Sequence, residues 1–91
     1  MPYEWDEEKR AETLRARGVA FDSMEYFDWD TALTFRSDRH GEVRWSSYGL
    51  IGDRLYHVAW TVRGESIRII SLRKANARET DNYDNQTSED N

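Results

Sequence analysis

The sequence predicts an α+β domain with two N-terminal helices, then a four-stranded antiparallel sheet, then a C-terminal helix. The main observation is a change of pattern near Thr31, where helical features give way to short segments of alternating apolar and polar residues. A second is the glycine in the short connections between these segments, which is typical of antiparallel hairpins. A third is the length, because 91 residues fit one domain.

Two helices are expected before the sheet. The first is predicted over Glu7–Arg17, because Asp6 is placed to cap it and its first turn is acidic and its last turn basic. Gly18 is placed to end this helix. A second, shorter helix is predicted over about Ser23–Phe27, after a possible cap at Asp22.

The sheet is expected to be a meander joined by short turns. The predicted strands are Thr31–Arg36, Glu42–Ile51, Arg54–Val62 and Ser66–Leu72. Successive side chains of a strand point to opposite faces, so each strand has an apolar face and a more polar one. In the third strand Val58 and Trp60 share the apolar face, whereas His57 and Thr61 share the other. The apolar faces are expected to pack on the N-terminal helices.

The last part of the chain is expected to form a helix and then a tail. The helix is predicted over Asn76–Asp84. Asn85–Asn91 has no apolar side chain, so it is expected to be a disordered acidic tail. The predicted domain therefore covers residues 1–84, and the tail covers residues 85–91.

Composition excludes several classes of protein. The chain has no cysteine, which rules out a disulfide framework and a thiolate metal site. It has no signal-like apolar run at its N-terminus and no stretch near the roughly 20 apolar residues of a membrane helix. A soluble cytoplasmic protein without membrane association is expected.

Charge is distributed unevenly along the chain. The net charge is −5, yet residues 31–78 carry nine basic and four acidic side chains. Acidic segments lie on both sides of this basic block. Exposed charges are screened beyond about 8–10 Å, so a local basic face attracts phosphate whatever the net charge. Eleven of the thirteen cations are arginine, which binds phosphate through two parallel hydrogen bonds.

Several motifs, in their order and spacing, resemble the BrnT family of toxins. They are Tyr3–Asp6, Gly18–Phe21, Glu42–Arg44 with Gly49 soon after, Leu55–Arg63, and Arg68–Ala75 followed by Glu79 and Tyr83. The last motif is the most specific, and the resemblance covers about residues 3–83. One departure is Ala16-Arg17-Gly18, where the family commonly has Lys-His-Gly. Any role of that histidine is therefore absent or has passed to Arg17.

The resemblance implies a RelE/ParE-like fold and a toxin of a type II toxin–antitoxin system. Toxins of this family are ribonucleases that inhibit translation. They are neutralised by BrnA, an antitoxin with a ribbon-helix-helix DNA-binding domain, and the complex represses its own operon. The implied partners are an RNA substrate, a BrnA-like antitoxin and, indirectly through the antitoxin, operator DNA.

RNA cleavage by attack of a 2′-OH needs three kinds of group. A base or positioning group acts on the hydroxyl, cations stabilise the phosphate, and an acid serves the leaving oxygen. No metal or other cofactor is needed, so a metal-independent endoribonuclease is expected. The candidates for phosphate and RNA contacts are Arg44, Arg63, Arg68, Arg73 and Lys74, and the candidates for the remaining catalytic roles are Glu42, His57 and Tyr83.

Each candidate also has a structural interpretation. The arginines are alternatively solvated side chains paired with acidic neighbours, and Glu42 is alternatively a salt-bridge partner. His57 is alternatively packed and hydrogen-bonded within a strand, and Tyr83 alternatively docks a helix on the sheet. Lys74 is alternatively a solvated residue at a junction. A metal site built from Asp38, His40 and Glu42 is not expected, because these residues lie in and beside a flexible loop.

Arg68 and Arg73 set a geometric condition for the site. They are five residues apart, so an ideal strand would place them on opposite faces. We predict that the strand bends or ends near Ser71, so that Arg73 and Lys74 turn back over the polar face.

A different class of function remains open at this point. A non-catalytic module that binds protein or nucleic acid, or a gyrase poison of the ParE type, would have the same class of fold. RNA cleavage by the purified protein would distinguish the ribonuclease from these alternatives.

Overall fold

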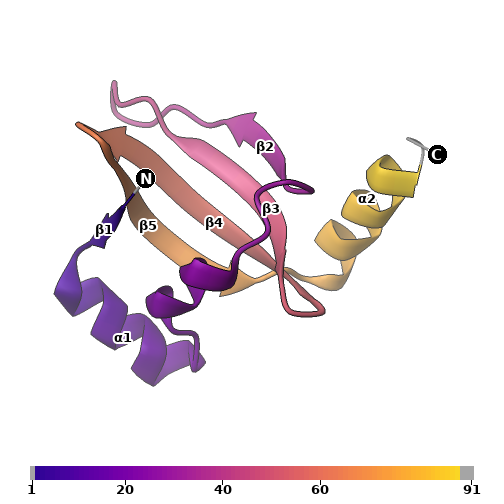
Figure 1. The fold of residues 1–91 in the computed structure, drawn as a ribbon, viewed down its shortest axis with the longest axis horizontal. Coiled ribbons are helices and arrows are strands. Elements are labelled where there is room, and N and C mark those ends of the chain that lie inside the picture. Colours follow the sequence, from indigo (N-terminus) through magenta and orange to yellow (C-terminus); the bar gives the residue numbers. More distant parts are fainter. Residues whose placement is uncertain (1, 89–91) are drawn as a thin grey trace.

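A computed structural model describes residues 2–88 of the chain. Figure 1 shows an α+β fold with a twisted sheet, one α-helix between the first and second strands, one after the last strand, and a short 3-10 helix over one face. In chain order the elements are β1 (Tyr3–Trp5), α1 (Glu7–Arg17), η1 (Phe21–Tyr26), β2 (Leu33–Arg36), β3 (Trp45–Ile51), β4 (Arg54–Arg63), β5 (Ser66–Lys74) and α2 (Ala77–Ser88).

The sheet is mixed and has five strands among the described residues, in the order β1-β5-β4-β3-β2. The four predicted strands form an antiparallel meander, but β1 adds a fifth strand that runs parallel to β5. The prediction of four antiparallel strands was therefore wrong. β1 has only three residues, too few for an alternating pattern to appear in the sequence.

The prediction of two N-terminal helices was also wrong, although the first helix was predicted correctly. α1 covers Glu7–Arg17, where Asp6 accepts hydrogen bonds from the backbone N–H groups of Glu8 and Lys9 at 2.9 and 3.4 Å. Gly18 ends it in the left-handed conformation. No side chain of α1 is buried, so the helix lies along the sheet as a largely exposed element.

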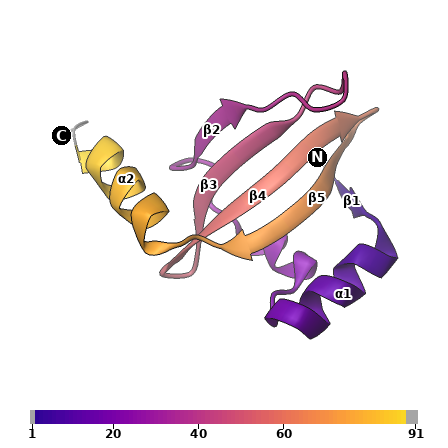
Figure 2. The same cartoon turned by 180° about the vertical axis from the view of Figure 1, so that it is seen from behind.

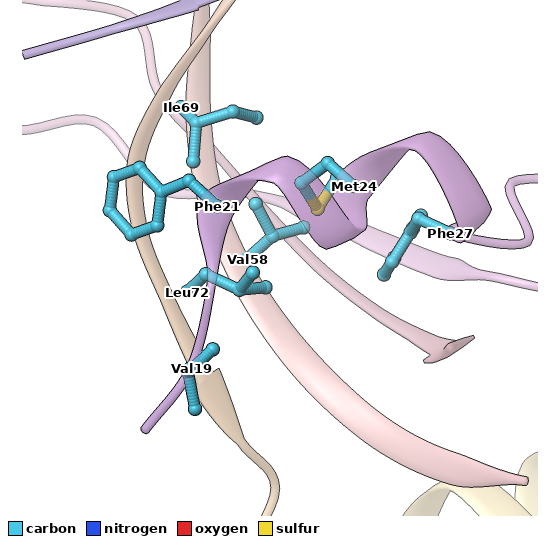
Figure 3. Packing of buried hydrophobic residues seen from close by; sticks show 7 residues of the cluster. All are labelled: Val19, Phe21, Met24, Phe27, Val58, Ile69 and Leu72. Carbon is cyan, nitrogen blue, oxygen red and sulfur yellow. The ribbon is translucent and has the colours of Figure 1, made fainter. Parts of the chain in front are cut away.

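The segment predicted as a second helix is the 3-10 turn η1. Its buried residues recur every three positions, at Phe21, Met24 and then Phe27. A 3-10 helix has three residues per turn, so these side chains lie in one row above the sheet. Figure 3 shows Phe21 and Met24 of this row near Ile69 and Val58, with Phe27 further along the chain.

Gly49 allows η1 to approach the sheet closely. A β-carbon at Gly49 would overlap the ring carbon Cζ of Phe27. The aromatic ring therefore occupies the space that any other residue at this position would fill.

Several strand and helix boundaries differ from the predictions. β2 and β3 begin at Leu33 and Trp45, two and three residues later than expected. α2 continues to Ser88, so Asn85–Ser88 is helical where the sequence predicted a disordered tail. The rest of that predicted tail, Glu89–Asn91, lies outside the described residues. No helix within residues 2–88 is long and apolar enough to cross a membrane.

A β-bulge in β5 determines which way its arginines point. Ala59 pairs with Ser71 and Trp60 pairs with Ile69, so Ile70 has no partner in β4. Arg68 pairs with Thr61 and Arg73 pairs with His57. Because Thr61 and His57 are four residues apart in β4, both arginines lie on the same face. The predicted bend or end near Ser71 is thus a single extra residue within a continuous strand.

Candidate functional site

One face of the sheet is covered by η1, whereas α2 covers only one end of the other face, which we call the open face. η1 packs on the face that carries Val58 and Leu72. The opposite face carries His57, Thr61 and Arg63 from β4, together with Arg68 and Arg73 from β5. In Figure 2 this face is toward the viewer, with η1 behind the sheet and α1 alongside β5.

A depression lies on this open face beside the start of α1. It brings together three of the predicted arginines, which come from the loop before β3, from β4 and from β5. Its lining consists of Asp6, Lys9, Glu42, Arg44, Thr61, Arg63, Arg68, Ile69 and Ile70. Four cations therefore line the depression against two carboxylates. Residues separated widely in sequence meet here because the β3–β4–β5 meander brings its strands together.

The segment Glu42–Arg44 lies in a loop, not in the predicted strand. The hydroxyl of Thr61, which is buried, donates to the carbonyl oxygen of Val43 at 2.7 Å. The backbone N–H of Ser37 donates to the carbonyl oxygen of Arg44 at 2.8 Å. These two bonds hold the loop against the depression.

The three arginines differ in their ionic partners. Arg44 pairs with Glu42, with 3.2 Å between Nη2 and Oε2. Arg68 is opposite Glu4 in the β1–β5 pairing, and its Nη1 lies 3.7 Å from that carboxylate. Arg63 has no ion pair within residues 2–88 and is exposed. The depression therefore offers one free guanidinium and two guanidinium groups in partly buried ion pairs, of which the Arg68–Glu4 pair is the longer.

Arg73 is held by a carboxylate that the sequence did not place in the site. Its two terminal nitrogens donate to Glu79 at 2.8 and 2.9 Å, and the hydroxyl of Tyr48 donates to the same carboxylate at 3.0 Å. These bonds, those to Arg73 above all, lower the pKa of Glu79 to about 2. The pKa of the Tyr48 hydroxyl is raised, first by burial and then by its bond to Glu79.

His57 lies beneath this cluster. Burial, and next the charge of Arg73, lower the pKa of its imidazole, so the ring is neutral at pH 7. Its ring centroid is 5.0 Å from that of Tyr48, and its buried Nδ1 atom has no hydrogen-bond partner within residues 2–88. Its surroundings match the packed interpretation of this histidine, apart from the missing hydrogen bond.

Four of the predicted residues do not line the depression, namely Arg73 and His57, described above, and Tyr83 and Lys74. Tyr83 is buried between α2 and the sheet, and its hydroxyl donates to the carbonyl oxygen of Thr31 at 3.1 Å. Lys74 pairs with Tyr56 in the sheet, so it points to the face opposite Arg73. The expectation that Arg73 and Lys74 turn back together over the polar face was wrong, because the strand continues through Lys74.

Sequence reasoning did not single out Glu79, Tyr48 or Lys9 as site residues. Glu79 was noted only as part of a motif, and its spacing after Asn76 is the available signal, since the two residues cap α2 reciprocally. Nothing in the sequence pointed to Tyr48, whose position opposite His57 depends on strand register.

The chemistry available at the depression is that of cations and carboxylates. Guanidinium groups bind phosphate oxygens and stabilise charge that develops on them. Glu42 places a carboxylate among these cations. Within residues 2–88 no group of three or more histidine, aspartate or glutamate side chains is arranged to hold a metal ion.

Comparison with known proteins identifies one matching family. A family model described as the ribonuclease toxin, BrnT, of type II toxin-antitoxin systems matches residues 5–79. The match spans α1, the whole β2–β5 meander and the start of α2. The comparison with curated proteins gave no match.

Proposed function

Because the chain belongs to the BrnT family of ribonuclease toxins of type II toxin–antitoxin systems, we propose that it cleaves RNA at the depression on the open face and so blocks translation in the cytoplasm. The observation that supports this site most is the meeting of Arg44, Arg63 and Arg68 in one depression with Glu42. A purely structural set of arginines would not need to converge from three separate segments.

In the proposed reaction, the 2′-oxygen of a ribose attacks the adjacent phosphorus. The bond from phosphorus to the 5′-oxygen breaks, which leaves a 2′,3′-cyclic phosphate and a 5′-hydroxyl. Glu42 accepts the proton of the attacking 2′-OH, and water supplies a proton to the leaving oxygen. Arg44, Arg63 and Arg68 stabilise the negative charge on the phosphate oxygens, so no metal ion is required.

Arg73 and His57 have supporting roles in this proposal. Arg73 remains on the same face but is held by Glu79, so it contributes positive charge and contacts RNA further along the face. His57 is neutral and keeps the floor beneath Arg73 uncharged. Lys74 and Tyr83 take no part in the reaction.

The protein partner follows from the family. A type II system pairs its toxin with a protein antitoxin. We propose that this antitoxin resembles BrnA, carries a ribbon-helix-helix domain and links the complex to operator DNA. Covering the basic face would then inhibit the toxin directly.

The first prediction tests cleavage by the purified protein. Arg63→Ala and Arg68→Ala should stay folded and lose RNA cleavage by about a hundredfold to a thousandfold, the usual effect of removing one group that stabilises the transition state. Cleavage of a labelled RNA is measured with EDTA present, and products are examined for cyclic phosphate ends. Arg78→Ala is the control, because Arg78 is exposed on α2 and lines no part of the depression.

Three outcomes would contradict the proposal. The first is near-normal cleavage by both folded variants, and the second is dependence on a divalent metal. The third is intact RNA with wild-type protein, accompanied by DNA damage in cells, which would favour the gyrase-poison alternative.

A further inference from the structure

A second depression lies between α1 and β5. Its lining consists of Lys9, Glu12, Thr13, Ala16, Arg17, Ser71, Leu72 and Arg73. The residues from α1 recur at intervals of three and four, so they share one side of the helix. Lys9 also lines the first depression, so the two join at this residue. Together they form a groove, which we call the α1–β5 groove.

Two cations on the α1 wall of this groove are free. Lys9 and Arg17 are both exposed, and neither forms an ion pair within residues 2–88. The wall carries one carboxylate, from Glu12. On the opposite wall, β5 presents the Ser71 hydroxyl and Arg73. Over its two depressions the groove is thus lined by six cations, Lys9, Arg17, Arg44, Arg63, Arg68 and Arg73, against the three carboxylates of Asp6, Glu12 and Glu42.

The spacing of these cations suits a chain of phosphates. Lys9 and Arg17 are eight residues apart on α1, which corresponds to about 12 Å along the helix axis. Phosphates of a stacked strand are roughly 3.4 Å apart along its axis, so about three nucleotides fit between the two cations. Arg63 lines the first depression together with Lys9, so further cations are available to the strand on that side.

The lining favours nucleic acid over a docked protein. Protein interfaces are anchored by apolar or aromatic side chains in buried pockets. The α1–β5 groove has four apolar lining residues, Ala16, Ile69, Ile70 and Leu72, and no aromatic one. Leu72 is itself buried in the core, so it offers almost no surface for an anchor.

We propose that α1 forms the second wall of an RNA-binding groove, and that Lys9 and Arg17 bind phosphates of the strand beside the cleaved bond. This inference rests on the proposed function, because it extends the same site. Single-stranded RNA then runs from Arg17, past Lys9, to the arginines of the first depression. Arg17 binds phosphate several nucleotides away from the reacting bond and holds the substrate without taking part in the reaction.

The test is the salt dependence of RNA binding. Each phosphate contact that is lost makes the plot of log K, the logarithm of the binding constant, against log salt less steep. Binding of a single-stranded RNA whose riboses are all 2′-O-methylated, and which therefore cannot be cleaved by 2′-OH attack, is followed by fluorescence anisotropy over a series of salt concentrations. Arg17→Ala should reduce the slope of log K against log salt by about 0.7, the value for one phosphate contact with a single strand. Arg15→Ala is the matched control, because Arg15 is exposed in the same helical turn but does not line the groove.

The outcomes separate this inference from the proposed function. If the slope for Arg17→Ala equals the slopes for wild type and Arg15→Ala, the inference that the groove binds RNA is overturned, even if wild-type protein cleaves RNA. A reduced slope supports the groove even if cleavage is absent, because binding is measured without the reaction. Loss of antitoxin binding by Arg17→Ala, with RNA binding unchanged, would assign this surface to the protein partner and overturn the inference. Circular dichroism spectra and melting curves confirm that each variant is folded.

Discussion

Glu79 connects three parts of the molecule through one carboxylate. It binds Arg73 of β5 through two hydrogen bonds and accepts a third from Tyr48 of β3. It also helps to cap the N-terminus of α2, because the side chains of Asn76 and Glu79 each accept a hydrogen bond from the backbone N–H of the other. The residue therefore fixes the start of α2 to the open face of the sheet.

The low pKa of Glu79 makes this connection sensitive to acid. Its pKa in the folded protein is about 2, below its ordinary value of 4.5. Such a group stabilises the fold fully above about pH 4.5 and loses this contribution as the pH falls toward about 2. When Glu79 is protonated, Arg73 faces His57 without a neutralising carboxylate. Burial of His57 disfavours a second positive charge on its imidazole.

Glu79→Gln should therefore destabilise the protein at pH 7 and much less at pH 3. We expect a loss of about 1–2 kcal/mol at pH 7, in the range for hydrogen bonds to a charged group at a partly exposed position. Urea unfolding at both pH values measures the difference. Asp81→Asn is the control, because Asp81 is exposed on the same helix and has no salt bridge within residues 2–88. An equal loss at both pH values would contradict this role of the charge.

At the scale of elements, η1 approaches the sheet closely at Gly49, which has no side chain. Gly49→Ala should destabilise the fold by about 1–3 kcal/mol, the usual effect of overpacking a core, because its β-carbon would overlap the Phe27 ring. Denaturant unfolding measures this loss. Gly49→Ala should lower the free energy of unfolding less in a Phe27→Leu background than in the wild type, because leucine is smaller and leaves room for the added β-carbon. Unchanged stability of Gly49→Ala would show that η1 shifts freely on the sheet.

Local signals explain which elements could be predicted. α1 has a cap at Asp6 and a terminating Gly18, and both act within a turn of the helix. The four meander strands alternate in pattern and are separated by short turns, so their antiparallel order was predicted correctly. β1 could not be predicted, because its pairing with β5 depends on residues far away in the sequence.

The candidate site also combines features that local sequence signals predict with features that they do not. Strand alternation explains why Arg63 of β4 and Arg68 of β5 lie on one face, whereas Arg44 reaches the depression from a loop that the sequence predicted as strand. The shared face of Arg68 and Arg73 depends on the bulge at Ile70, and the sequence has no signal that distinguishes Ile70 from its neighbour. Because β5 continues through Lys74, the side chain of Lys74 points to the face opposite that of Arg73.

At the scale of the whole molecule, a net charge of −5 coexists with a basic groove. The acidic side chains contribute to the overall field, but at physiological salt this field is screened within about 8 Å. RNA near the groove therefore meets mainly the local cations. An antitoxin that covers the groove needs acidic side chains for the same reason.

Expression of this chain alone should arrest growth, and co-expression of its cognate antitoxin should restore it. The physical reason in our proposal is that an antitoxin over the basic face and the RNA compete for the same cations. Growth curves and co-purification of the two proteins measure both effects. Arg68→Ala, expressed at the same level, is the control that should not arrest growth. Normal growth with verified expression of folded wild-type protein would count against the toxin function.

The parallel pairing of β1 with β5 also has a consequence for synthesis on the ribosome. Tyr3–Trp5 emerges first, and its partner strand Ser66–Lys74 emerges last among the strands. Hairpins between neighbouring strands form early, whereas closing so long a loop comes late. α1 is anchored to the sheet edge through β1, and β5 is the other wall of the α1–β5 groove. A nascent chain therefore has no complete groove until β5 has left the exit tunnel, so a translation product that ends before Ser66 lacks one of the two walls.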